Sequence, residues 1–206
     1  MKTGKALIIG AGDFSPRGLV VKKGDWLIAA DGGLNHLASL GLRPHLVLGD
    51  MDSVSHLPQG VARLTFPVKK DRTDMALAIL LALSRGYTRF TLHGALGGRL
   101  DHSLANLHLV CALAESGHQA VIQDRKLTVY ALHNSGLKLP FVPAGRVVSV
   151  FAWGGLARGV SLKGLKYPLS DAALTATEPL GVSNEGLGKP ARIHVKDGTL
   201  LVMVAR

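Results

Sequence analysis

Short hydrophobic runs, each followed by glycine, aspartate or lysine, recur along the first half of the chain. Runs at residues 6–9, 26–30, 45–48, 64–68, 90–92 and 120–123 have the length of buried β-strands. Helical stretches are expected between them at residues 34–40, 72–84 and 100–116. Strands that alternate with helices predict a parallel sheet with helices on both faces, which is a Rossmann-like α/β/α arrangement.

The pattern changes near residue 124. Strand-like runs follow at residues 126–132, 146–151, 191–195 and 199–204, and no long helical pattern separates them. Lys196-Asp197-Gly198 between the last two runs is typical of a tight hairpin. We therefore predict an α/β domain over residues 1–124 and a small, mostly antiparallel β domain over residues 125–206.

The composition, 47% hydrophobic and 18% charged, is that of an ordinary globular protein. The longest uninterrupted apolar run, residues 75–83, is far shorter than the roughly 20 residues needed to cross a bilayer. Near the N-terminus we expect a buried strand rather than a signal peptide. The single cysteine, Cys111, excludes an internal disulfide, so a cytoplasmic protein without a membrane partner is expected.

The net charge of +10 favours acidic partners. Residues 125–206 hold 11 Lys and Arg against 4 Asp and Glu. Such a basic region either binds nucleic acid or attracts phosphorylated substrates. The charges are scattered singly rather than in a stripe interleaved with aromatic residues, so nucleic acid is not expected as a partner.

Carboxylates gather at the predicted strand ends. Every acidic residue between Ala30 and His102 is an aspartate: Asp31, Asp50, Asp52, Asp71, Asp74 and Asp101. The carboxyl ends of parallel strands share one edge of a sheet, which predicts a common site. Asp50 and Asp52 are two apart in an extended segment and face the same side, where both can reach a hard cation such as Mg²⁺.

Some of these aspartates have a structural alternative. Asp71 can act as the cap of the following helix, with Asp74 completing a capping box. Asp101 can be a first-turn carboxylate that stabilises the helix dipole. The sequence leaves these alternatives open.

A glycine-rich segment, Gly94-Ala95-Leu96-Gly97-Gly98-Arg99, precedes a predicted helix. Its backbone N–H groups and the Arg99 guanidinium suit phosphate oxygens. It is not a P-loop, because no Gly-Lys-Ser/Thr follows. Gly10-Ala11-Gly12 lacks the third glycine of a dinucleotide fingerprint, and the nine histidines show no metal-site spacing.

Taken in order, these motifs resemble those of the thiamine pyrophosphokinase family. The matching stretches are Ala30-Asp31-Gly32-Gly33, Gly49-Asp50-Met51-Asp52-Ser53, Lys70-Asp71-Arg72-Thr73-Asp74, Gly94, Gly97-Gly98-Arg99-Leu100-Asp101-His102, Asn106, Gly164-Leu165-Lys166-Tyr167-Pro168-Leu169 and Ser183-Asn184-Glu185. Single motifs are weak, but several in the right order are specific.

The resemblance implies roles for individual residues. Asp50, Asp52, Asp71 and Asp74 correspond to carboxylates that hold Mg²⁺ and the triphosphate, and with Arg99 they form the catalytic set. Asp31, Gly32, Gly33, Gly97, Gly98, Arg99, Asp101 and His102 correspond to the ATP and phosphate site. Tyr167, Ser183 and Asn184 correspond to the thiamine pocket, with the aromatic ring stacking on thiamine.

The resemblance further implies pyrophosphoryl transfer from ATP to thiamine, with AMP leaving, by a homodimer whose active site lies at the interface. Two alternatives stay open. The acceptor can be another small alcohol such as a hydroxymethylpterin, although the matches around Tyr167 and Asn184 argue against it. A nucleotide- or nucleic-acid-binding module without catalysis is the other alternative; the clustered aspartates argue against it, because carboxylates repel phosphate unless a metal is present.

Overall fold

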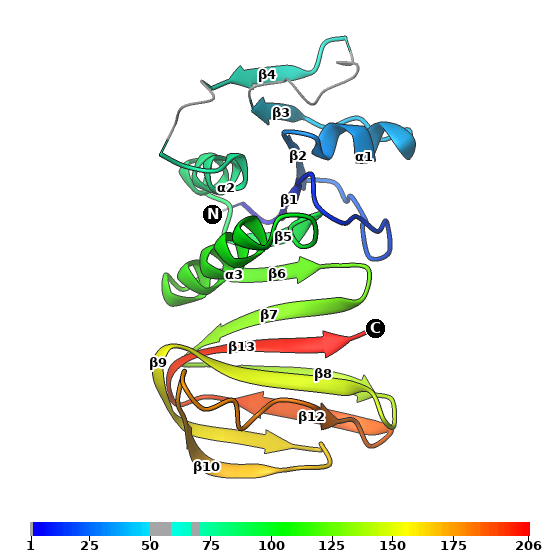
Figure 1. Cartoon of the computed structure of the whole chain (residues 1–206). Coiled ribbons are helices and arrows are strands. Elements are labelled where there is room, and N and C mark those ends of the chain that lie inside the picture. Colours follow the sequence, from blue (N-terminus) through cyan, green and yellow to red (C-terminus); the bar gives the residue numbers. More distant parts are fainter. Residues whose placement is uncertain (1, 50–58, 67–70) are drawn as a thin grey trace. The chain divides into compact units, whose positions relative to one another are not determined.

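The structure is a computed structural model that describes residues 2–49, 59–66 and 71–206. The chain divides into two compact units (Figure 1). The first comprises Met1–Leu109 with His118–Arg125, and the second comprises Val110–Gly117 with Lys126–Arg206.

The first unit is built on a parallel sheet. Its strands are β1 (Ala6–Ile9), β2 (Trp26–Ala30), β3 (Leu46–Gly49), β4 (Ala62–Thr65), β5 (Arg89–His93) and β6 (Gln119–Gln123), in the spatial order β4-β3-β2-β1-β5-β6. Each pairing between these neighbours is parallel, as predicted. All residues of β1, β2 and β3 are buried, whereas all of β4 is exposed at the sheet edge.

Helices cover the sheet of the first unit. They are α1 (Gly33–Ser39), α2 (Asp74–Ser84) and the first part of α3 (Leu100–Glu115), whose residues from Val110 onward belong to the second unit. Figure 1 shows α1 and α2 on opposite faces of the sheet. On the α1 face, Leu34 and Leu37 pack with Leu7 and Ile9 of β1. Burial on both faces explains why these strands are continuous hydrophobic runs rather than alternating ones.

The second unit is an antiparallel β structure. Its strands are β7 (Leu127–His133), β8 (Gly136–Val142), β9 (Val147–Lys163), β10 (Leu169–Leu174), β11 (Asn184–Glu185), β12 (Lys189–His194) and β13 (Asp197–Ala205). The first part of β9 pairs with β13, and its later part pairs with β10 and β12. The sequence prediction ended this strand at residue 151 and missed β8, β10 and β11. Gly154, at φ 72°, interrupts the hydrophobic run inside the continuous strand.

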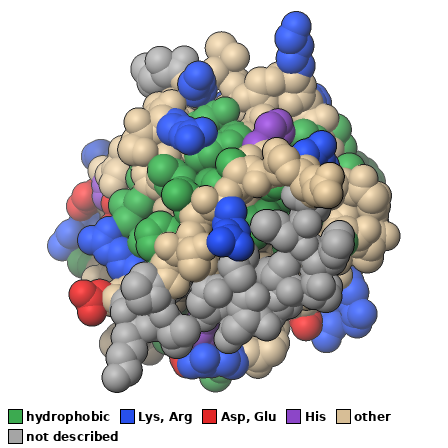
Figure 2. Space-filling model, turned by 90° about the horizontal axis from the view of Figure 1, so that it is seen from above, with side chains coloured by type: hydrophobic (Ala, Val, Ile, Leu, Met, Phe, Trp, Pro, Cys, Tyr) green, Lys and Arg blue, Asp and Glu red, His purple; other side chains and the backbone are tan. Residues whose placement is uncertain are grey.

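Two further sequence expectations concern the surface. No helix in the described part of the chain is long and apolar enough to cross a bilayer. Among the described side chains on the face that Figure 2 shows, Lys and Arg are scattered between hydrophobic and uncharged ones rather than arranged in a continuous stripe. The cytoplasmic location stays a prediction.

Candidate functional site

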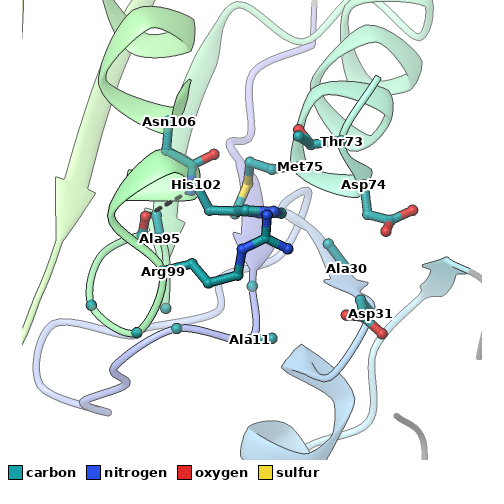
Figure 3. Close-up of a pocket in the computed structure, with 15 residues that line it drawn as sticks. Ala11, Ala30, Asp31, Thr73, Asp74, Met75, Ala95, Arg99, His102 and Asn106 are labelled. Carbon is teal, nitrogen blue, oxygen red and sulfur yellow. Dashed lines mark hydrogen bonds between the residues drawn. The ribbon is translucent and has the colours of Figure 1, made fainter. Parts of the chain in front are cut away.

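A pocket of about 380 Å³ lies where the strand order of the first unit reverses. β2 is on one side of β1, and β5 is on the other. In an open parallel sheet, the loops that follow two such strands diverge and leave a crevice for a ligand. The lining residues come from these loops and from the start of α2 and α3 (Figure 3): Gly10, Ala11, Gly12, Ala30, Asp31, Thr73, Asp74, Met75, Gly94, Ala95, Gly97, Gly98, Arg99, His102 and Asn106.

Backbone hydrogen bonds join the loops after β1 and β5. The N–H of Gly12 donates to the carbonyl of Gly94 at 2.8 Å, and the N–H of Asp13 donates to the carbonyl of Leu96 at 2.7 Å. A Cβ on Gly12 would lie 2.3 Å from the Leu96 oxygen, so only glycine permits this close approach. The segment at residues 10–12, which is no dinucleotide fingerprint, is therefore one wall of the pocket.

The glycine-rich loop forms the adjoining wall and leads into α3. Gly97 and Gly98 have left-handed φ angles of 83° and 62°, which glycine adopts without strain. Neither N–H group is hydrogen-bonded to another described residue. Both are therefore available to an anion placed at the start of α3, where the helix dipole favours negative charge.

Arg99 supplies the positive charge of the pocket. Its guanidinium donates to both carboxylate oxygens of Asp101, from Nε at 3.2 Å and from Nη2 at 2.6 Å. This hydrogen-bonded pairing raises the pKa of Arg99 and lowers the pKa of Asp101. The side chains are 72% and 64% exposed, so Arg99 can exchange this partner for a phosphate group. Asp101 itself does not line the pocket, whereas His102 does.

Asp31 and Asp74 supply the negative charge. Figure 3 shows both carboxylates on the side of the pocket away from the glycine-rich loop. Asp31 follows β2 and has a left-handed φ of 50°, a conformation that aspartate tolerates better than most residues. Its N–H donates to the carbonyl of Leu48 at 2.8 Å, which fixes the end of β2 against β3.

α2 begins two residues later than predicted. Thr73 is its N-cap, and the Thr73 hydroxyl accepts a hydrogen bond from the N–H of Ala76 at 3.2 Å. The interpretation of Asp71 as the cap is therefore wrong. Asp71 is exposed and does not line the pocket, whereas Asp74 occupies the first turn of the helix.

Other predicted residues are placed differently. Asp50 and Asp52 lie outside the described residues. Gly32 and Gly33 are buried and do not line the pocket. A Cβ on Gly33 would lie 1.9 Å from the carbonyl oxygen of Ile9, so close packing of α1 on β1 explains this glycine. No three His, Cys, Asp or Glu side chains within the described ranges are grouped so that they could hold a metal ion.

The predicted acceptor residues Tyr167, Ser183 and Asn184 lie in the second unit. The Tyr167 side chain is 57% exposed, whereas Asn184 is 3% exposed. The Asn184 amide oxygen accepts from the N–H of Tyr167 at 3.0 Å, and its amide nitrogen donates to the carbonyl of Tyr167 at 2.6 Å. Asn184 thus holds the backbone that carries the exposed ring. Ser183 has a left-handed φ of 57°, and its N–H donates to the Ser149 hydroxyl at 3.1 Å.

Sequence reasoning missed several lining residues. Gly10 and Gly12 follow the first strand, but only the strand order shows that this strand adjoins β5. From the sequence, Asp71 rather than Thr73 is considered as the helix cap, although a threonine directly before a helix is a recognised N-cap residue. No sequence signal distinguishes Met75 from the other hydrophobic residues of α2.

Comparisons with known proteins agree with these observations. Residues 18–122 match the family model described as "Thiamin pyrophosphokinase, catalytic domain", and residues 135–200 match "Thiamin pyrophosphokinase, vitamin B1 binding domain". The chain is 24% identical over 182 residues to "Thiamine pyrophosphokinase" of Bacillus subtilis (strain 168), which covers 85% of each chain.

Solved structures have the same fold. A crystal structure of thiamine pyrophosphokinase from Bacillus subtilis superposes with a TM-score of 0.88 at 22% identity and covers 98% of both chains. The structure of a thiamin pyrophosphokinase family protein from Enterococcus faecalis superposes with a TM-score of 0.81 at 26% identity, over 98% of this chain and 99% of that one.

Proposed function

The chain belongs to the thiamin pyrophosphokinase family, and we propose that it transfers the pyrophosphoryl group of ATP to the hydroxyl of thiamine, giving thiamine diphosphate and AMP. The observation that carries this proposal is the pocket of the first unit, in which Arg99 and an open glycine loop face two aspartates. The similarities do not favour a hydroxymethylpterin acceptor or a non-catalytic binding module.

The glycine loop and Arg99 bind the triphosphate. The N–H groups of Gly97 and Gly98 donate to phosphate oxygens, and Arg99 leaves Asp101 to form a bidentate contact with the same group. The thiamine hydroxyl gives its proton to one of the aspartates as its oxygen attacks the β-phosphorus. The bond between that phosphorus and the oxygen that bridges to the α-phosphate breaks, and negative charge accumulates on the departing AMP. Fixed N–H groups and a guanidinium stabilise that charge without having to reorganise.

Mg²⁺ is proposed to bind on the side of the pocket that Asp31 and Asp74 line. Mg²⁺ prefers oxygen ligands and is usually held by one or two carboxylates together with substrate phosphates. Asp74 lines the pocket, and Asp71 precedes it by three residues. These two residues, with Asp50 and Asp52, would hold the ion, and Asp31 would lie beside the nucleotide. Such an ion would supply positive charge that stabilises the negative charge of the triphosphate.

The second unit is proposed to bind the acceptor. The exposed ring of Tyr167 offers a face for stacking on thiamine, and Ser183 is proposed to contribute to the same acceptor site. Lys166 Nζ lies 5.4 Å from the centroid of this ring and 3.0 Å from a carboxylate oxygen of Glu185. The ion pair with Glu185 offsets the repulsion between Lys166 and the cationic thiazolium of thiamine. In this proposal residues 1–124 bind ATP and residues 125–206 bind thiamine.

We further propose a homodimer with the active site at the interface. Besides Leu156, the second unit exposes six large hydrophobic side chains among its described residues: Phe141, Val147, Tyr167, Leu180, Val182 and Leu187. The segments that carry them are joined, since Glu185 pairs with Val147 and the N–H of Gly188 donates to the carbonyl of Val142 at 2.9 Å. Exposed hydrophobic side chains on neighbouring segments are typical of an interface, and a second copy of the chain is the proposed partner. Light scattering should give the mass of a dimer, and Leu187→Asp should shift it toward a monomer.

The test of the reaction is to incubate the protein with ATP, Mg²⁺ and either thiamine or a hydroxymethylpterin, and to separate the nucleotides by chromatography. The proposal expects AMP to form in equal amount to thiamine diphosphate, and only with thiamine. Stoichiometric ADP would instead indicate an ordinary kinase, and AMP formed only with the pterin would change the acceptor.

A further inference from the structure

The glycine loop has an unusual arrangement of its carbonyl groups. The carbonyl oxygens of three successive residues, 94–96, each accept a hydrogen bond from a donor outside the loop. The donors are the N–H of Gly12 at 2.8 Å, the side-chain nitrogen of Asn106 at 2.6 Å, and the N–H of Asp13 at 2.7 Å. Figure 3 shows the bond from Asn106 to Ala95.

This arrangement matters because a carbonyl oxygen repels a phosphate group, whereas an N–H group binds it. A carbonyl that is bound to a donor of its own cannot turn toward the triphosphate. Rotation of one peptide group would turn its C=O toward the phosphate in place of its N–H. The hydrogen bonds to residues 94–96 therefore set the orientation of the loop just before Gly97 and Gly98.

Two of the three donors belong to the backbone and persist whatever side chain is present. The third is the Asn106 amide, which is 7% exposed and bonds to Ala95, itself 4% exposed. Loss of this donor would leave the buried Ala95 carbonyl without its partner. The unpartnered oxygen can then be satisfied if the peptide rotates toward the pocket, where water can bind it.

We propose that Asn106 is a positioning residue that holds the Ala95 carbonyl away from the triphosphate, so that the glycine loop presents N–H groups to ATP. This inference rests on the proposed function. It assigns to Asn106, which also lines the pocket, the orientation of the phosphate loop rather than direct contact with the nucleotide.

The test measures the binding of ATP and of inorganic triphosphate, each with Mg²⁺, by titration calorimetry. Asn106→Leu has nearly the same size without a donor, and Asn106→Asp has the same shape with an acceptor only. We expect both ligands to bind about tenfold more weakly to Asn106→Leu, because one hydrogen bond to the loop is lost, and more weakly still to ionised Asn106→Asp, which also adds a negative charge. The KM for thiamine should not change.

Ser103 provides a matched control one turn earlier on α3. Its hydroxyl lies 3.2 Å from the carbonyl of Arg99 and 3.4 Å from that of Gly97, so it makes only long contacts. Ser103→Ala should bind both ligands as the unchanged protein does.

Several outcomes would overturn the inference. A loss confined to ATP, with inorganic triphosphate bound normally, would show that Asn106 contacts the nucleoside. Unchanged binding of both ligands would show that the loop does not need this bond. If Asn106→Leu does not fold, Asn106→Asp decides alone. Protonation removes the added charge and restores a donor, so triphosphate binding must recover to that of the unchanged protein as pH falls, and a deficit of about tenfold that remains contradicts the proposal. Failure of the unchanged protein to form AMP would instead refute the proposed function.

Discussion

Replacing Arg99 by glutamine should weaken ATP binding without unfolding the protein. The guanidinium is 72% exposed, and its partner in the structure is the similarly exposed Asp101, so the pair adds little to stability. In the proposed complex the same group makes up to two charge-assisted hydrogen bonds to phosphate. Their loss should raise the KM for ATP or lower kcat/KM by about 10- to 100-fold. Arg99→Lys should recover part of this, because it keeps the charge but loses the bidentate geometry.

Arg158 offers a control of equal charge and similar exposure. It is 63% exposed and lies 3.7 Å from Asp197 in the second unit. Steady-state kinetics with varied ATP, together with thermal unfolding, should be measured for Arg99→Gln and Arg158→Gln. Equal losses in the two variants would mean that the net charge, not the site, attracts ATP. Normal kinetics of Arg99→Gln would remove Arg99 from the active site altogether.

Three further predictions concern the two ligand sites. Asp74→Asn should abolish turnover at unchanged thermal stability, since it removes a charge from the pocket without creating a cavity; full activity would exclude Asp74 as a metal ligand. Gly97→Ala should raise the KM for ATP more than Gly117→Ala does. The φ angles of Gly97 and Gly117 are 83° and 78°, so the backbone strain of the two variants is matched. The methyl group added at Gly97 would lie 2.3 Å from the carboxyl carbon of Asp13, whereas that at Gly117 would meet no atom within 4 Å. Asn184→Leu should raise the KM for thiamine and leave the KM for ATP unchanged, because it removes both hydrogen bonds to the backbone of Tyr167. An unchanged KM for thiamine would show that these bonds are not needed.

Much of the first unit could be predicted because burial on both faces leaves a strong sequence pattern. β1 and β2 have the predicted bounds, and both are buried throughout. The predicted strand at residues 64–68 begins two residues after the start of β4 at Ala62. β4 is an exposed edge strand, in which core packing does not restrict the side chains. In the second unit, Gly154 and Gly155 interrupt the hydrophobic pattern, although the strand continues through them.

The site was predictable where its chemistry depends on residue type. The sequence predicts Asp31 and Asp74 as carboxylates at strand–helix junctions and Arg99 as the phosphate-binding residue of the glycine-rich segment, and the structure places all three in one pocket. The Gly10–Gly12 wall depends on which strands are neighbours, and the Asn106 bond depends on the path of the loop. Neither property is local in the sequence, so periodicity and spacing could not show them.

The most direct test of the proposed reaction uses ATP that carries a radioactive β-phosphate, with thiamine and Mg²⁺. Attack at the β-phosphorus moves this atom to thiamine, so the label should appear in thiamine diphosphate while the nucleotide product, AMP, is unlabelled. Label that stays with the nucleotide, as ADP beside thiamine monophosphate, would contradict pyrophosphoryl transfer.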